Sequence, residues 1–213
     1  NPAPSPIRAD VLIIAVVAFL TLIALSGAQA LLPQLVVAYG AEPAIAGFAV
    51  NAATLGMAVS GLAVAWFADR IDRKAGIWRC LLLLSIPTAL LSFTDSIWIF
   101  MALRIVQGAL MAAAFTLTMT YLSEQCAHTA ITGALSAYIT GNVASNLIGR
   151  LAAVTAADAT GLGGSFLMFA AFNLIGAVLA LWLTGRLEDR PRMHGRRALE
   201  GWRRHQTIHL HRR

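Results

Sequence analysis

Two arginines stand inside long apolar stretches of the chain, where a charged side chain is costly. Arg104 and Arg150 are flanked by aliphatic residues, and these stretches contain no acidic residue that could pair with either. An arginine in apolar surroundings must be offset by water, backbone carbonyls, a carboxylate or an anionic ligand. Both arginines are therefore candidates for a binding or a helix-bracing role.

The first arginine shares one helical face with a glutamine and a glycine. Gln107, Gly108 and Met111 follow Arg104 at i+3, i+4 and i+7, so all four lie on one side of a helix. The glycine lets this side approach another helix closely. Arg104 can then donate hydrogen bonds to backbone carbonyls or to Gln29 of an earlier apolar stretch.

The second arginine belongs to a polar stripe. Asn142, Asn146 and Arg150 follow one another at intervals of four residues, and three glycines on the same stretch recur every eight residues. Polar side chains in an apolar layer must face protein or a water-filled cavity. Two interpretations stay open for this stripe and Gln29: structural contacts between helices, or the wall of a substrate cavity. Arg150 favours the cavity, because nothing acidic in these stretches compensates its charge.

A cluster of charges separates the second and third apolar stretches. It consists of Asp69, Arg70, Arg73 and Lys74. A carboxylate at a helix end can cap a neighbouring helix, and the cations can pair with carboxylates across a moving interface. The alternative is that these charges only orient the chain in a membrane. That alternative explains the basic residues but not Asp69.

The residues that enzymes and metal sites need do not occur in the required patterns. No apolar stretch holds a histidine that could activate Ser165, and no phosphate-binding Gly-Lys-Ser/Thr loop is present. Cys80 and Cys126 are too far apart for a metal-binding pair. The sequence predicts that this protein is not an enzyme and has neither a cofactor nor a metal site.

Composition predicts an all-α integral membrane protein. Of the 213 residues, 58% are hydrophobic and only 12% are charged, whereas soluble domains carry about 25% charged residues. The apolar runs are long and do not alternate with polar residues, which favours helices over a barrel. Six runs approach or exceed the about 20 residues that a membrane span needs: 11–37, 45–68, 76–94, 97–121, 130–156 and 163–185.

The basic residues gather on one side of these six predicted spans. All of the 16 Lys and Arg residues except Arg104 and Arg150 lie on one side if the six spans alternate: in the termini, in alternate connections or, for Arg79, at the start of the third span. The charged residues in the other connections are all acidic: Glu42, Asp95 and Asp158. The positive-inside rule then places both termini in the cytoplasm, and the basic charge indicates topology and not a nucleic-acid partner. Residues 1–10 form the cytoplasmic N-terminus, 11–185 the bundle, and 186–213 a basic cytoplasmic tail or linker.

Two of the motifs resemble signatures of the major facilitator superfamily. The loop around Asp69 is similar to the family's Gly-x-x-x-Asp-Arg-x-Gly-Arg-Arg/Lys, with Ala65 and Asp72 in place of its two glycines. The run from Arg104 to Gly108 reads Arg-Ile-Val-Gln-Gly and resembles the family's Arg-x-x-Gln-Gly. The resemblance covers essentially residues 10–185. Aspartate tolerates the left-handed geometry of a turn glycine better than most residues.

The resemblance implies a fold and an activity. The fold would be the N-terminal six-helix half of a transporter, built as a 3+3 inverted repeat. The activity would be proton-coupled transport of a small molecule across the inner membrane by alternating access. The charged loop would lock the two halves, and Arg104 would serve proton coupling or brace the first and fourth helices. Efflux members often carry Gly-Pro-x-x-Gly-Gly in the fifth span, where this chain retains only Gly141.

One half of a transporter needs a partner. The second six-helix half would come from the same gene, with this chain an N-terminal fragment, or from a second copy in a dimer of half-size proteins. The missing initial methionine and the unpaired arginines favour the fragment. A six-span membrane scaffold that transports nothing is the alternative function.

Overall fold

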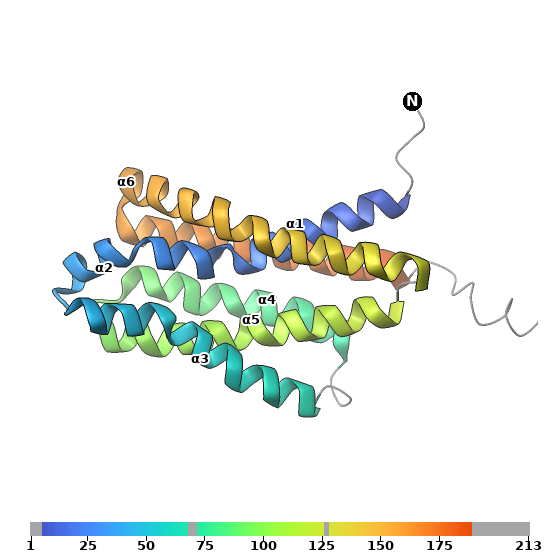
Figure 1. Cartoon of the computed structure of the whole chain (residues 1–213), viewed down its shortest axis with the longest axis horizontal. Coiled ribbons are helices and arrows are strands. Elements are labelled where there is room, and N and C mark those ends of the chain that lie inside the picture. The colour runs from blue at the N-terminus through green and yellow to red at the C-terminus, as the bar shows by residue number, and fades with distance from the viewer. Residues whose placement is uncertain (1–5, 68–71, 126–127, 189–213) are drawn as a thin grey trace, which may run out of the picture.

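The computed structural model describes residues 6–67, 72–125 and 128–188, and over these ranges it is helical and contains no strand. The prediction of an all-α bundle is thereby confirmed. Figure 1 shows the helices lying lengthwise beside one another. In chain order the elements are α1 (Pro6–Ala30), α2 (Leu32–Tyr39), α3 (Pro43–Phe67), α4 (Arg73–Leu90), the 3-10 turn η2 (Leu91–Phe93), α5 (Ile97–Gln125) and α6 (His128–Glu188).

Five helices in the described ranges are long and apolar enough to cross a membrane. Their apolar segments are Leu12–Ala30, Pro43–Val64, Arg73–Phe93, Ile97–Ser123 and Thr132–Leu183. The first four correspond to the first four predicted spans. The last segment has 52 residues and covers all but the outermost two residues of both the fifth and the sixth predicted span.

α6 consists of two arms that meet at a reversal. Gly161 lies inside α6 with φ 76° and ψ 176°, which is not a helical conformation. Glycine adopts such a positive φ without the steric penalty that a side chain would bring. Figure 1 shows the two arms running in opposite directions, so that α6 returns to the end of the bundle at which it began.

The first predicted span is divided between α1 and α2. Leu31, between the two helices, has φ −85° and ψ 2°, and α2 begins with a proline in its first turn. α2 ends at Tyr39 and is capped by Gly40, whose φ of 55° is left-handed and whose backbone N–H bonds back to the last turn. The apolar run at 11–37 is therefore one long helix followed by a short one, and not a single helix.

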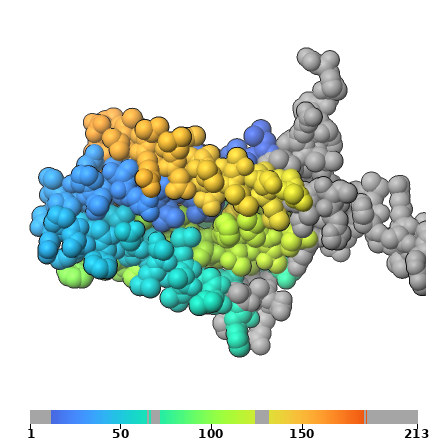
Figure 2. All heavy atoms as spheres, viewed as in Figure 1, coloured from blue at the N-terminus to red at the C-terminus, as the bar shows by residue number. Residues whose placement is uncertain are grey.

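The helices pack in pairs that fix the shape of the bundle. α1 lies along α6, α3 lies along α5, and α4 contacts both α5 and α6. In Figure 1, α4 and the second arm of α6 lie behind α3 and the first arm of α6. The space-filling view shows the front of the molecule covered by α1, α3, α5 and the first arm of α6 (Figure 2). We call this surface the front face.

Glycines bring α3 and α5 into backbone contact. A Cβ placed on Gly108 would collide with the carbonyl of Ala53, and one on Gly56 would collide with the carbonyl of Ile105. Because each collision is with backbone and not with a flexible side chain, neither helix can yield without moving as a whole. The two glycines therefore set the separation of α3 and α5.

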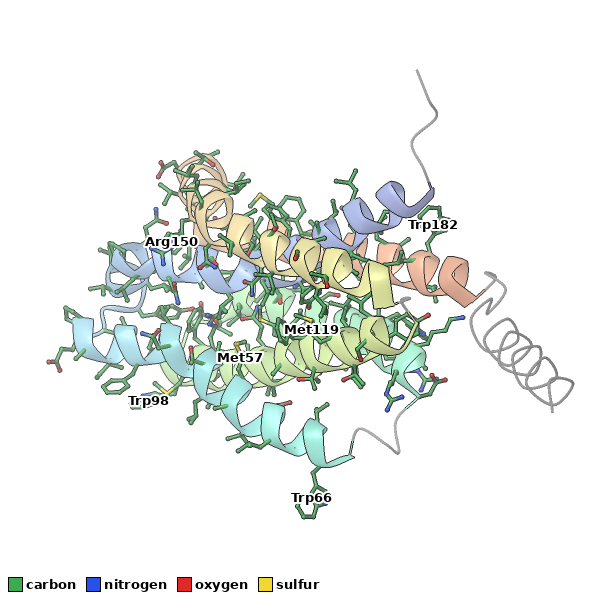
Figure 3. The ribbon with its side chains drawn as sticks, turned by 45° about the vertical axis from the view of Figure 1, so that its right-hand side comes forward. Met57, Trp66, Trp98, Met119, Arg150 and Trp182 are labelled. Carbon is green, nitrogen blue, oxygen red and sulfur yellow. The ribbon has the colours of Figure 1, made fainter. Side chains whose placement is uncertain are left out.

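Tryptophans lie toward the two ends of the bundle. The start of α1, the α3–α4 and α5–α6 junctions and the end of α6 lie together at one end, while α2, η2 and the reversal of α6 lie at the other (Figure 1). Figure 3 shows Trp66 and Trp182 toward the first end and Trp98 toward the second. The side chains of Trp66 and Trp98 are 85% and 65% exposed. Exposed tryptophans near both ends are typical of helices that cross a membrane.

Candidate functional site

Arg104 is completely buried between α5 and α3. Its Nε and Nη2 donate hydrogen bonds to the carbonyl oxygen of Val50 at 3.3 and 3.0 Å, and its Nη1 donates to Oε1 of Gln107. The side chain has 0% exposure. Because Val50 lies within α3, the guanidinium links α5 to α3 through a backbone oxygen.

The helical face predicted around Arg104 points into the bundle. Arg104, Gln107, Gly108 and Met111 are all buried. Of the two partners considered for the arginine, the structure shows a backbone carbonyl, and Gln29 bonds elsewhere. The resemblance implied bracing of the first and fourth helices, whereas these bonds connect α3 and α5, which correspond to the second and fourth predicted spans.

The hydrogen bonds continue from Gln107 into two further helices. Gln107 Nε2 donates to Oγ1 of Thr88 on α4 at 2.8 Å, and Asn173 Nδ2, on the second arm of α6, donates to the same oxygen at 3.1 Å. Thr88 Oγ1 donates to the carbonyl of Leu84 at 2.7 Å. These side chains, which are all buried with 0% exposure, form what we call the polar chain: Arg104, Gln107, Thr88 and Asn173.

Two members of the polar chain were missed at the level of sequence. Asn173 is the only amide side chain in the run 163–185, and Thr88 is a hydroxyl within an apolar helix. A lone amide in an apolar run is a signal that could have identified Asn173. Their pairing depends on how α4 and α6 pack, which no spacing along the sequence reveals.

The second arginine lies on the first arm of α6 beside α1, as Figure 3 shows. Arg150 Nη2 donates to Gln29 Oε1 at 3.1 Å, and Ser26 Oγ donates to Asn146 Oδ1 at 3.1 Å. Asn146 Nδ2 donates in turn to the backbone carbonyl of Asn142 at 3.3 Å. The structure thus brings together all four residues predicted for the cavity wall, and it adds Ser26 to them.

The two arginines differ in burial. Arg104 is enclosed, whereas Arg150 and Asn146 are exposed and Asn142 and Gln29 are half-buried. Within the described part of the chain, the hydrogen-bond partners of both arginines are neutral oxygens. Arg150 therefore keeps most of its five N–H donors available on the surface of the bundle.

Close helix contact positions the exposed stripe. A Cβ on Gly141 would collide with the carbonyl of Ala15, and one on Gly149 would come within 3.0 Å of the carbonyl oxygen of Ile23. These two members of the glycine series face α1, whereas a Cβ on Gly133 would meet nothing within 4 Å. The glycines hold the first arm of α6 against α1, so that Asn146 and Arg150 reach residues of α1.

The charged loop is described only in part. Asp69 and Arg70 lie outside the described residues, while Arg73 and Lys74 form the first turn of α4. Asp72 caps this helix: its side chain accepts from the backbone N–H of Lys74 at 3.1 Å and of Ala75 at 3.4 Å. Its φ is −62°, so the position where the family has a turn glycine needs no left-handed backbone in this chain.

A hydrogen bond connects two loops at the far end of the bundle. The hydroxyl of Tyr39 lies 2.9 Å from both the carbonyl oxygen and Oγ1 of Thr94, and its ring lies 5.7 Å from that of Phe100. Burial raises the pKa of the Tyr39 phenol above its usual 10.0, and the charge of Asp95 raises it further, against the opposing effect of the Thr94 hydrogen bond. We call this contact the Tyr39 latch, since it ties α2 to the connection before α5.

The structure gives no cluster suited to a metal within the part of the chain that it describes. Among the residues it describes, no group of three or more His, Cys, Asp or Glu side chains could hold an ion. The histidines after residue 188 lie outside the described ranges.

Comparison with known proteins gives a consistent answer. The family model of the Major Facilitator Superfamily matches residues 14–210. An uncharacterized transporter of Buchnera aphidicola subsp. Acyrthosiphon pisum is 26% identical over 155 residues, which cover 72% of this chain and 38% of that protein. The inner membrane transport protein YnfM of Escherichia coli is 30% identical over 123 residues, or 58% of this chain and 30% of that protein. The chain therefore spans well under half the length of these relatives. The extent of the family match shows that this chain belongs to the major facilitator superfamily.

Proposed function

We propose that this chain is one half of a secondary active transporter that moves a small molecule across the inner membrane by alternating access. The observation that carries the proposal is the family match over residues 14–210 on an all-helical, membrane-type bundle. Transporters of this architecture bind substrate near the middle of the bilayer, between two bundles that rock against each other. The front face is where we place the second bundle.

The reversal of α6 supports six spans. A straight helix of the 52 apolar residues would be about 78 Å long, at about 1.5 Å per residue, which is more than twice the about 30 Å of a bilayer core. The turn at Gly161 divides this length into two arms, each long enough to cross once.

The glycine contacts support the 3+3 inverted repeat. In such a repeat the first and fourth spans are equivalent, as are the second and fifth. Gly56 of the second span meets the backbone of the fourth at Ile105, and Gly141 of the fifth meets the backbone of the first at Ala15. The repeat would exchange these two contacts.

The roles of the motifs follow from their places. We assign Arg104, with Gln107 and Gly108, to bracing α3 against α5, because its bonds join these two helices. We assign Asp69, Arg70, Arg73 and Lys74 to the cytoplasmic gate between the halves, on the resemblance of the loop. Proton coupling would require a carboxylate from the second half, since the described helices place none against either arginine.

The exposed stripe on α1 and α6 suggests the class of substrate. Arg150, Gln29 and Asn146 present several hydrogen-bond donors together at the contact of the two helices. We propose that they bind a substrate with an acidic or strongly polar group.

Changing Arg150→Gln should lower substrate affinity by about tenfold or more, since a charge-assisted hydrogen bond is lost. Arg150→Lys should restore part of this affinity. The measurement is competition for transport at equal expression. If both variants bind normally and only lose thermal stability, Arg150 is structural.

The overall proposal is tested on the full-length gene product. The purified protein is reconstituted in proteoliposomes and offered a panel of labelled small molecules, with and without a proton gradient. We expect saturable uptake of a panel member that responds to the gradient. If exchange is saturable but indifferent to the gradient, transport stands and proton coupling is wrong. A protein that inserts fully but moves no member of a broad panel would favour the scaffold.

A further inference from the structure

The hydrogen bonds of the polar chain run in one direction. An arginine side chain has donors and no acceptor, so Gln107 must turn its oxygen to Arg104 and its amide nitrogen to Thr88. The single hydroxyl hydrogen of Thr88 goes to the Leu84 carbonyl. Thr88 Oγ1 therefore accepts from Gln107 and also from the Nδ2 of Asn173. Arg104 thus fixes the orientation of the Gln107 carboxamide, and the bond from Thr88 to Leu84 fixes which atom of Asn173 faces the hydroxyl.

This direction leaves one polar atom without a partner. The Oδ1 of Asn173 is buried and has no hydrogen-bond partner among the described residues. An unpartnered buried amide oxygen lowers stability, and leucine has about the same volume without this penalty. What Asn173 provides, in exchange for this penalty, is the N–H that occupies the last lone pair of Thr88.

The last two members of the chain lie on helices to which the structure gives Arg104 no hydrogen bond of its own. Thr88 lies on α4 and Asn173 on the second arm of α6, whereas the guanidinium joins α5 and α3. α4 packs against both α5 and α6. A shift of α4 or of the second arm of α6 is therefore transmitted to Gln107 through the Thr88 hydroxyl.

We propose that Thr88 and Asn173 are positioning residues for Arg104, which hold Gln107 with its oxygen toward the guanidinium. Without the Thr88 hydroxyl, the Gln107 amide nitrogen has no acceptor and the carboxamide rotates. Arg104 then loses its partner at Nη1, and its two bonds to the Val50 carbonyl loosen. Its relevance to transport rests on the bracing role proposed above for Arg104, but the test below needs no substrate.

The test observes the Arg104 side chain directly by nuclear magnetic resonance. The full-length protein is labelled with ¹⁵N-arginine in lipid nanodiscs, and the Nε–H signal of Arg104 is identified by its absence in Arg104→Lys. The measured quantity is the rate at which this proton exchanges with water. Thr88→Val removes the hydroxyl while keeping the shape, and Thr88→Ser keeps the hydroxyl. Thr21→Val is the matched control, because Thr21 is equally buried but bonds only to the Val17 carbonyl of its own helix.

We expect Thr88→Val to speed exchange by about tenfold, as the loss of one buried hydrogen bond implies, and Asn173→Leu to speed it by a smaller factor. Thr88→Ser and Thr21→Val should stay near the native rate. The double variant Thr88→Val with Asn173→Leu should exchange no faster than Thr88→Val alone, since the two act through one hydroxyl.

The proposal is overturned if Thr88→Val folds and leaves the Arg104 signal and its exchange unchanged, because a packing role lowers only the unfolding temperature. If Thr88→Val does not fold, the same assay is applied to Asn173→Leu and Thr88→Ser. Faster exchange of the Arg104 Nε–H in Asn173→Leu than in Thr88→Ser supports the proposal, and equal rates contradict it. A transport defect without a change in this signal would leave the transporter assignment intact and remove the positioning role.

Discussion

At the scale of the residue, the two arginines represent two ways of keeping a charge in an apolar layer. Arg104 is enclosed, and a carbonyl oxygen and an amide oxygen take the place of water around it. Arg150 is exposed on the bundle and bonds to a single described partner, Gln29. A charge satisfied internally suits a brace, while a charge with free donors suits a site that meets a ligand or a second protein surface.

The glycine next to this brace makes a sharp test of close packing. Gly108→Ala places a methyl group against the Ala53 carbonyl, so α3 and α5 must separate. We expect a loss of about 1–3 kcal/mol in stability, as for other overpacked interiors. The measurement is the unfolding temperature in detergent. Gly61→Ala is the control, because a Cβ there meets nothing within 4 Å, and alanine favours a helix by about 0.5–1 kcal/mol over glycine. Equal melting of the two variants would contradict the close contact.

At the scale of the element, the Tyr39 latch connects a short helix to a loop through one phenol. Because the folded pKa of Tyr39 is raised, the neutral phenol stabilises the fold at pH values below the usual 10.0. This stabilisation is lost as the pH rises through the higher pKa of the folded protein. We expect the tyrosinate absorbance of the native protein minus that of Tyr39→Phe to titrate above pH 10.0. A midpoint at or below 10.0 would show that the phenol is not buried as described.

The helices themselves were largely predictable, and the exceptions have physical causes. Long apolar runs between charged connections fix four spans without tertiary information, because the bilayer demands a minimum length. The break at Leu31 depends on local backbone geometry, with a proline close behind it. The cap by Asp72 follows from a side-chain preference that the family comparison concealed, since the family has glycine there.

The candidate site was predictable only where one helix carries the pattern. The face of Arg104 and the stripe of Arg150 each repeat along a single helix, so spacing alone indicates them. The partners of each lie on other helices: Val50 and Thr88 for the first chain of bonds, and Ser26 for the second. Which helices touch is decided by packing around glycines, and that information is not periodic in the sequence.

At the scale of the whole molecule, the charge distribution predicts the orientation in the membrane. Arg73, Lys74 and Arg79 lie in the first two turns of α4, at the end where α1 starts and α6 finishes, while Glu42 and Asp158 flank the elements at the opposite end (Figure 1). The positive-inside rule then puts the basic end in the cytoplasm.

A labelling experiment checks this orientation. In a background without Cys80 and Cys126, Glu42→Cys and Asp158→Cys should react with a membrane-impermeant thiol reagent in intact cells. Arg79→Cys, whose side chain is also exposed, should react only after the membrane is opened. Reaction of Arg79→Cys in intact cells would reverse the proposed topology.

The front face and the rear of the bundle should differ in their access to water, and this separates a cavity wall from a structural contact. Asn146 is exposed on the first arm of α6, and Val178 is 67% exposed on the second arm, behind it. If the front face lines a central cavity, Asn146→Cys should react with a water-soluble thiol reagent, in the same background without Cys80 and Cys126. Val178→Cys should face lipid and react far more slowly, because thiolate forms only in contact with water.

A transported substrate should slow the reaction of Asn146→Cys and leave the reaction of Val178→Cys unchanged. Equal rates at the two positions, or labelling at Asn146 that substrate does not affect, would leave Asn146 as a contact between α1 and α6 and place the substrate site elsewhere.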